Sequence, residues 1–412
     1  MNSGKGLAIG KNRSSIVCVR WECSLRRTAR AVSRLTLAIS FLSALLVIAA
    51  SPARAQTLTV LHSFGSGTDG SNSRASLIRD TQGNLYGTTD AGGGTGYGTV
   101  FMMSPSGVEK VLYSFPGNGT NGESPWGSLV RDSQGNLYGT TFYGGVGSGT
   151  VFMTTRAGVE TVLHNFTAGA DGADPWAGLL RDAQGNLYGT TYMGGLYNNG
   201  TVFQVTPSGT ETVLHSFLGA DGAWPLGALV QDASGNLYGT TYVGGAYNYG
   251  TVFKLTLSGT VTVLYSFTGG VDGAKPYGSL VRDAQGNLYG TTFYGGANNH
   301  GTVFEVSPSG IERVFHSFIQ AGLDGGSPVA GLVQDSNGVL FGTTSYGGSY
   351  NYGTVFMVIP AGNIYRTLYS FTGGADGGRP FGGLVVDAQD NLYGVTQWYG
   401  AYGGGAAFRL VP

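Results

Sequence analysis

The side chains best suited to binding chemistry are tryptophans and tyrosines that stand beside Asn and Asp in glycine-rich segments. Rigid aromatic rings next to amides and carboxylates suit a flat, polyhydroxylated ligand or a protein surface. We predict ligand-binding residues at Trp126, Trp176, Trp224, Tyr249, Tyr277, Tyr352, Trp398 and Tyr399. For any single residue of this set, packing between structural units is the competing interpretation, with neighbouring Asn residues in left-handed turns.

Two repeated polar features favour structure over chemistry. Four of the five histidines occupy one repeated position that Tyr takes elsewhere, namely His62, His164, His215 and His316. Interchange with Tyr indicates packing with a hydrogen bond rather than metal ligation. An Asp-Gly pair also recurs, at Asp69, Asp171, Asp221, Asp272, Asp324 and Asp376, with Asn121 in the remaining copy. Calcium needs six to eight oxygens and each segment offers about one carboxylate, so an Asx-type turn is favoured.

Catalytic signatures are weak throughout the sequence. We find no nucleophile elbow, no His-Glu zinc helix and no isolated catalytic triad. The glycines near Gly93 join two expected strands rather than a strand and a helix, which excludes a dinucleotide-binding loop. A paired-carboxylate site formed by Glu123 and Asp174 remains open, and Trp398 and His300 are further departures from the common pattern. We expect no cofactor and no metal.

Seven tandem copies of one unit must position these side chains. Asn-Leu-Tyr-Gly-Thr-Thr or a close variant recurs at intervals of 50 to 52 residues. The third copy reads as four short strands, over residues 178–181, 186–191, 201–205 and 211–217. Residues 182–185 and 207–209 have the composition of tight turns. Four strands in each repeat of this length predict an all-β, seven-bladed β-propeller.

The ends of the repeat region predict how the ring closes. Residues 57–64 read as a lone fourth strand, and the last copy stops after its third strand, 406–410. Pairing these two strands completes the seventh blade and removes the exposed edges. Antiparallel order then places the blade-joining loops and the loops between strands two and three on one face. That face carries the sequence variation, and the uniform turns occupy the other face.

The repeated pattern also resembles a known family. Asp-Gly-x-x-Pro-x-x-Gly-Leu-Val-x-Asp-x-x-Gly-Asn-Leu-Tyr-Gly-Thr-Thr-x-x-Gly-Gly, followed by Gly-Thr-Val-Phe, is similar to the GloVer-type tandem repeat of bacterial surface and secreted proteins. The resemblance covers the whole chain after residue 55. In that family the repeat accompanies one of several sorting anchors, and no activity is established for the repeat. No C-terminal anchor is evident here, so we expect a soluble exported form.

The first 55 residues predict export. They hold nine basic residues and one acid, followed by an apolar run over 35–50 and a small-x-small motif ending at Ala55. This layout is typical of a signal peptide, with an uncleaved anchor as the alternative. Residues 56–412 then form the propeller domain, with 13 Lys and Arg against 22 Asp and Glu and no cysteine. That negative charge disfavours nucleic acid and anionic lipid as partners.

Two functions fit these observations. The first is an exported, non-catalytic recognition or scaffold propeller, secreted or at the periplasm or cell surface, that binds an extracellular glycan or protein through its variable loop face. The alternative is an extracellular glycan-active hydrolase or lyase with its site on that face. Near-uniform copies favour the first function, because catalysis usually needs residues unique to one or two blades.

Overall fold

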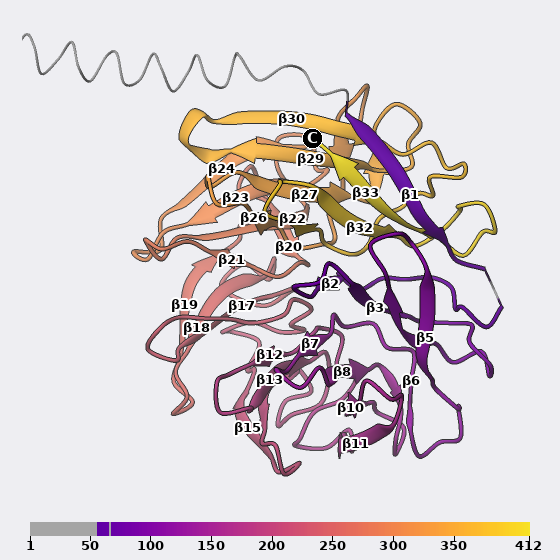
Figure 1. Ribbon diagram of the computed structural model, residues 1–412. Coiled ribbons are helices and arrows are strands. Elements are labelled where there is room, and N and C mark those ends of the chain that lie inside the picture. Colours follow the sequence, from indigo (N-terminus) through magenta and orange to yellow (C-terminus); the bar gives the residue numbers. More distant parts are fainter. Residues whose placement is uncertain (1–55, 66) are drawn as a thin grey trace, which may run out of the picture. The chain divides into compact units, whose positions relative to one another are not determined.

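The structure is a computed structural model that describes residues 56–65 and 67–412. The predicted signal peptide, residues 1–55, lies outside the described residues. Within the described part the regular structure is strand, apart from one 3-10 turn, η1 (Pro360–Gly362). The strands form seven small antiparallel sheets arranged as the blades of a propeller (Figure 1). The predicted fold class and blade number are confirmed.

The first four blades each hold four strands in sequence order. Blade 1 consists of β2 (Ile78–Arg79), β3 (Leu85–Thr89), β4 (Thr99–Met103) and β5 (Glu109–Ser114). Blade 2 consists of β7 (Val130–Arg131), β8 (Leu137–Thr141), β10 (Thr150–Thr154) and β11 (Glu160–Asn165). Blade 3 consists of β12 (Leu180–Arg181), β13 (Leu187–Thr191), β14 (Thr201–Val205) and β15 (Glu211–Ser216). Blade 4 consists of β16 (Val230–Gln231), β17 (Leu237–Thr241), β18 (Thr251–Leu255) and β19 (Val261–Ser266).

The remaining blades follow the same plan with small additions. Blade 5 consists of β21 (Val281–Arg282), β22 (Leu288–Tyr294), β23 (Thr302–Val306) and β24 (Glu312–Ser317), and β20 (Ala274–Pro276) also pairs with β22. Blade 6 consists of β26 (Val333–Gln334), β27 (Leu340–Thr344), β29 (Thr354–Ile359) and β30 (Ile364–Ser370). Two short ladders join loops, β6 (Gly122–Glu123) with β9 (Tyr143–Gly144) and β25 (Gly325–Gly326) with β28 (Tyr346–Gly347).

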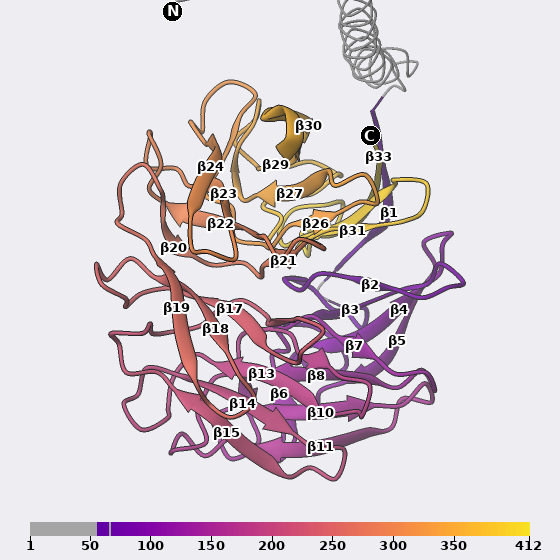
Figure 2. The ribbon, with the colours of Figure 1, turned by 90° about the vertical axis from the view of Figure 1, so that its left-hand side faces the viewer.

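The seventh blade closes the ring by joining the two ends of the described chain. It consists of β31 (Val385–Val386), β32 (Leu392–Thr396), β33 (Ala406–Val411) and β1 (Thr57–Ser63). The register runs from Thr57 opposite Val411 to Ser63 opposite Ala406. Figure 2 shows β1 beside β33, next to the C-terminus. The predicted pairing of the first strand with the last copy is confirmed.

The core lies between neighbouring blades rather than within one blade. Phe217 of blade 3 packs against Phe253 of blade 4 with ring centroids 5.2 Å apart, and both are fully buried. Burying a side chain of this size contributes about 1.5–3 kcal/mol. Within a blade, Phe203 lies directly opposite Gly189, and a Cβ on Gly189 would come within 2.5 Å of the Phe203 ring. The glycine of the repeated motif therefore makes room for the core phenylalanine.

The turn side of the ring carries the same polar network in copy after copy. Asp232 accepts hydrogen bonds from the backbone N–H groups of Ser234 and Asn236, from the Asn236 side chain and from the Tyr238 hydroxyl. Burial opposes the charge of this carboxylate, but the hydrogen bonds outweigh it and lower the Asp232 pKa to about 2. The network fixes the turn between the first two strands of the blade.

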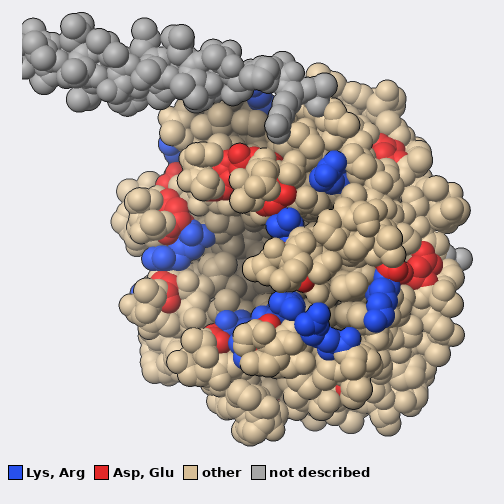
Figure 3. All heavy atoms as spheres, viewed as in Figure 1, with Lys and Arg blue, Asp and Glu red and all other residues tan. Residues whose placement is uncertain are grey.

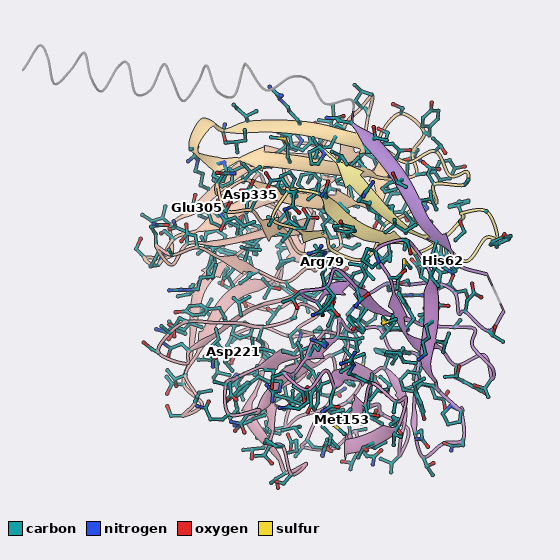
Figure 4. The ribbon with its side chains drawn as sticks, in the orientation of Figure 1. His62, Arg79, Met153, Asp221, Glu305 and Asp335 are labelled. Carbon is teal, nitrogen blue, oxygen red and sulfur yellow. The ribbon has the colours of Figure 1, made fainter. Side chains whose placement is uncertain are left out.

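Arginines on the turn side also link neighbouring blades. Four blades end their first strand with Arg, namely Arg79, Arg131, Arg181 and Arg282. The Arg79 guanidinium lies 5.7 Å from the ring centroid of Tyr393 in the preceding blade. On the side seen in Figure 3, Lys and Arg border a hollow near the middle of the ring, and Figure 4 labels Arg79 at the inner end of β2. Blades 4 and 6 have Gln231 and Gln334 at this position. The side-chain amide of each donates a hydrogen bond to a backbone carbonyl of the turn that follows in its own blade.

Candidate functional site

On the loop side, each blade contributes one residue to the centre of the ring, and the type of this residue differs from blade to blade. In six blades it follows a proline at the end of the blade-joining loop, as Trp176 follows Pro175, and in blade 1 it follows Ser73. The seven residues, here called the axial ring, are Arg74, Trp126, Trp176, Leu226, Tyr277, Val329 and Phe381. They line one pocket that encloses about 70 Å³ of water-accessible space. Because every blade contributes to the lining, this pocket lies on the ring's axis.

Four aromatic residues of the axial ring contact one another across the pocket. Trp126 meets Trp176 edge-on, with centroids 4.5 Å apart. Tyr277 is 5.8 Å from Trp176 and 6.4 Å from Phe381, also edge-on. The smaller side chains of the intervening blades 4 and 6 leave room for these contacts. Edge-to-face geometry is the favoured arrangement of aromatic pairs, so the rings form a stable apolar wall.

Small residues beneath the axial ring bring the first strands close together. A Cβ on Gly278 would lie 2.4 Å from the Ala330 backbone carbon of the next blade. Serine hydroxyls join neighbouring blades here, because Ser128 accepts from the Ser76 backbone N–H and Ser279 accepts from the Ala228 N–H. The last blade is tied to the first in the same way, from the Gly383 N–H to the Ser76 hydroxyl. The axial pocket therefore has a narrow, rigid base.

Arg74 is the charged member of the axial ring, and residues of blades 1 and 7 hold it from two sides. Its Nε donates to Asp90 Oδ2 at 2.7 Å, with 26% of the Arg74 side chain exposed against 9% of Asp90. Burial raises the Asp90 pKa, and the Arg74 charge opposes that rise. The buried Gln397 side-chain oxygen accepts from Arg74 Nη2 at 3.1 Å in the amide orientation that satisfies both groups. The guanidinium also lies 4.9 Å from the Trp126 ring centroid.

A second set of residues whose type varies between copies surrounds the axial ring. In each copy this residue lies two positions before the axial-ring residue in the sequence. All seven residues have a positive φ between 52° and 58°, namely Asn72, Ser124, Asp174, Trp224, Lys275, Ser327 and Arg379. Each N–H donates to the preceding blade's loop, as Trp224 donates to the Asn199 carbonyl at 2.9 Å. Glycine or Asn suits this conformation best, and other side chains pay about 1 kcal/mol or more there. The backbone conformation is therefore the same in all seven copies, although the side chain differs.

The structure divides the predicted binding residues among several places. Trp126, Trp176 and Tyr277 come together in the axial ring. Trp224 belongs to the left-handed set and packs on Tyr192, with centroids 5.5 Å apart. The predicted residues therefore divide into an axial cluster and outlying rings.

The other four predicted residues lie on loops away from the axial pocket's lining. Tyr352 and Tyr399 contact each other edge-on at 4.8 Å. Trp398 is 41% exposed and lies 5.9 Å from the Arg379 guanidinium, and Tyr249 is 42% exposed. Sequence reasoning missed Arg74, Asp90 and Gln397. Aligning the seven copies would have found them, because each replaces an apolar or aromatic residue of most other copies.

The repeated histidines and Asp-Gly aspartates form the structural contacts expected for them. His215 Nε2 lies 2.7 Å from Asp221 Oδ2, and the ring packs edge-on against Phe217. Asp221 also accepts from the Leu218 N–H and so fixes the blade-joining loop. Figure 4 shows His62, a member of the same set, at the outer rim on β1. The prediction of packing with a hydrogen bond is confirmed for His62, His215 and His316. His164 packs on Phe166, but its Nε2 lies 3.5 Å from Asp171 and has no hydrogen-bond partner among the described residues.

Two searches of the described chain gave negative findings. Over residues 56–65 and 67–412, no group of three or more His, Cys, Asp and Glu side chains is arranged to hold a metal ion. No helix in this part has the length and apolar character needed to cross a membrane.

The repeat unit has a counterpart among known protein families. The model of the Gloeobacter/Verrucomicrobia repeat matches residues 47–181, 144–339 and 312–412. Together these segments cover most of the chain. No curated protein matches the chain in sequence.

Solved structures with a similar fold include two of the BT4673 extracellular domain from B. thetaiotaomicron, described as a one component and as a hybrid two component system. The first is 12% identical over 84% of this chain, with a TM-score of 0.54, and the second is 11% identical over 85%, with a TM-score of 0.55. The chain spans only 39% of either BT4673 structure. XC5397 from Xanthomonas campestris, a gluconolactonase, is 16% identical over 76% of this chain and 89% of its own, with a TM-score of 0.46.

Proposed function

The chain belongs to the Gloeobacter/Verrucomicrobia repeat family, and from that premise we propose that it is an exported, non-catalytic recognition propeller. Its ligand is an extracellular glycan or protein surface, and the binding site is the axial pocket on the loop side. The predicted signal peptide, with mature protein starting near Gln56, is part of this proposal. Export is tested by N-terminal sequencing of protein recovered outside the cytoplasm.

The observation that carries the proposal is the loss of repeat symmetry at the axial ring. Buried strand positions keep nearly the same residue in all copies, as Phe203 and Phe253 do. The axial ring instead combines one charged, four aromatic and two aliphatic residues on the same backbone. Aromatic anchors in a partly buried pocket provide most of the binding energy at recognition sites. A single pocket built from all seven blades therefore suits one ligand held on the axis.

The solved structures of similar fold support an extracellular role. Both BT4673 structures are extracellular domains, although the likeness concerns the fold at identities of 12% and 11%. In line with this likeness, we propose that the propeller acts at the cell surface, in the periplasm or in the medium.

Hydrolysis of a glycan is the weaker alternative. Two carboxyl groups must flank the scissile bond in most such enzymes. Within the described residues, the lining of the axial pocket includes no Asp or Glu. Asp90 lies behind Arg74 and is engaged with it. Glu123 and Asp174 belong to the loop around the pocket rather than to its lining.

The proposal is tested by screening the purified protein on glycan and peptide arrays and then measuring the affinity of two variants. Trp176→Leu copies the Leu226 of blade 4, so the fold tolerates it, and the loss of one aromatic anchor should weaken binding by roughly 1–3 kcal/mol. Trp398→Leu removes a tryptophan outside the pocket and serves as the matched control. Equal affinities for both variants would place the ligand elsewhere and overturn the axial assignment.

A further inference from the structure

We propose that the axial pocket receives the carboxylate of an acidic sugar, a uronate, and that Arg74 is the residue that binds it. The inference rests on the proposed function and names the class of ligand for the same site. It depends on three properties of the pocket, namely which hydrogen-bonding groups remain free, where the charges lie and how much space is enclosed.

The polar groups that line the pocket are hydrogen-bond donors. Arg74 uses its Nε on Asp90 and one N–H of Nη2 on Gln397, which leaves the two N–H groups of Nη1 and one N–H of Nη2 for a ligand. Ser128 and Ser279 already accept backbone N–H groups through their hydroxyl oxygens, so their O–H groups remain to donate. A lining of donors without Asp or Glu calls for a ligand that presents acceptors.

The charges near the pocket favour an anion among such ligands. Arg74 is the charged residue of the lining, and Asp90 and Gln397 hold it in place. Lys275 and Arg379 lie in the left-handed set around the axial ring. Asp174 is the acid of that set, and burial raises its pKa.

The enclosed space sets the size of the group that enters. About 70 Å³ of water-accessible space holds roughly five waters, which is a head group rather than a whole sugar. A carboxylate on Arg74 fits this space, and bidentate contact between guanidinium and carboxylate is the preferred geometry. The attached ring would then lie on the aromatic faces of Trp176 and Tyr277 at the mouth. A carboxylate beside a flat ring is the chemistry of a uronate.

The experiment compares two probes of equal length on the purified protein. Oligogalacturonides are the acidic probe, and the same oligosaccharides with each carboxylate reduced to a hydroxymethyl group are the neutral probe. Titration calorimetry should give at least about tenfold tighter binding of the acidic probe, as expected for one charge-assisted pair. Oligoglucuronides and a peptide library with free C-terminal carboxylates extend the comparison.

Two variants separate the role of Arg74 from general charge. The double variant Arg74→Leu with Asp90→Tyr copies the Leu226 and Tyr242 of blade 4, so no buried charge is left unpaired. It should abolish the preference for the acidic probe. Arg79→Gln removes one positive charge from the turn side and copies Gln231, so the preference should persist.

Each outcome bears on the proposal. A carboxylate preference that the double variant removes supports it. Equal binding of the acidic and neutral probes overturns the carboxylate assignment and leaves the recognition function standing. Binding of the peptide carboxylates alone overturns the sugar assignment, and no binding of any of these probes while the array yields another ligand overturns the whole inference. Loss of all array binding would instead count against the proposed function.

Discussion

The turn side and the loop side of this propeller share one backbone repeat but treat their side chains differently. On the turn side, Asp232 and its counterparts accept the same hydrogen bonds in successive copies. On the loop side, the left-handed position keeps φ within 52° to 58° while its residue changes from Trp224 to Lys275 to Arg379. Constant side chains thus specify the fold, and constant backbone with changing side chains marks the surface available for recognition.

The largest loss of stability is expected for a buried core residue, which supports the turn side and the loop side alike. Phe203→Ala removes a fully buried ring between blades and leaves a cavity, so it should lower the free energy of unfolding by about 3–5 kcal/mol. Chemical denaturation of the variant and the parent measures the difference. A loss below about 1 kcal/mol would mean that the blades do not depend on this inter-blade core.

A turn-side substitution should have the next largest effect. Asp232→Ala leaves the Tyr238 hydroxyl and two backbone N–H groups without their acceptor, at about 2 kcal/mol of stability. Because the folded pKa of Asp232 is lowered to about 2 from 3.8, its contribution is complete above pH 4 and is lost as pH falls toward 2. Acid titration of unfolding should therefore show a smaller decline in the variant. A variant as acid-sensitive as the parent contradicts this account.

A glutamate at the edge of blade 3 should give the opposite pH dependence. Burial, and then the nearby Asp171, raise the pKa of Glu211 to about 7. The folded state therefore holds this proton more tightly than the unfolded state, and stability declines as pH rises from about 4.5 through 7. Glu211→Val copies Val261 of blade 4 and should flatten this decline. Thermal midpoints from pH 5 to 8 check it, and a curve parallel to the parent's would refute it.

The smallest effect on stability is expected at the axial ring, where the residue type already differs between blades. Phe381→Tyr gives blade 7 the side chain that blade 5 already carries at the axial ring, and it should change stability by less than about 1 kcal/mol. Thermal unfolding measures this. If Phe381→Tyr destabilises as much as Asp232→Ala, the axial ring is part of the fold's specification and the contrast between the two sides fails.

The strands could be predicted from the sequence because the repeat reveals which positions do not change. The expected third strand, 201–205, coincides with β14, and the expected fourth strand, 211–217, ends one residue beyond β15. The first strand is shorter than expected, since β12 pairs only over Leu180–Arg181. Gly178 instead packs against the backbone of Ser128 in the neighbouring blade, where a Cβ would lie within 2.7 Å.

The site was less predictable because residue type alone does not give a side chain's position in the ring. Trp176 follows its proline and lines the axial pocket, whereas Trp224 precedes its proline and takes the left-handed position. A shift of two positions thus sends the same side chain to different surroundings. Arg74 could not be identified as a candidate site residue from the sequence, because its contacts with Asp90 and Gln397 are formed only in the folded ring.

The pairing of β1 with β33 also determines the order in which the molecule can be completed. Thr57 and Val411 lie at opposite ends of the described chain, so their contact has nearly the greatest sequence separation available. Loop-closure entropy grows slowly with length, but contacts of such high separation form late and slow folding. Until residue 411 is available, the seventh blade lacks a partner strand and leaves an unpaired edge that other chains can join. A growing chain therefore passes through an open ring, and aggregation should compete with folding at that stage rather than in the finished propeller.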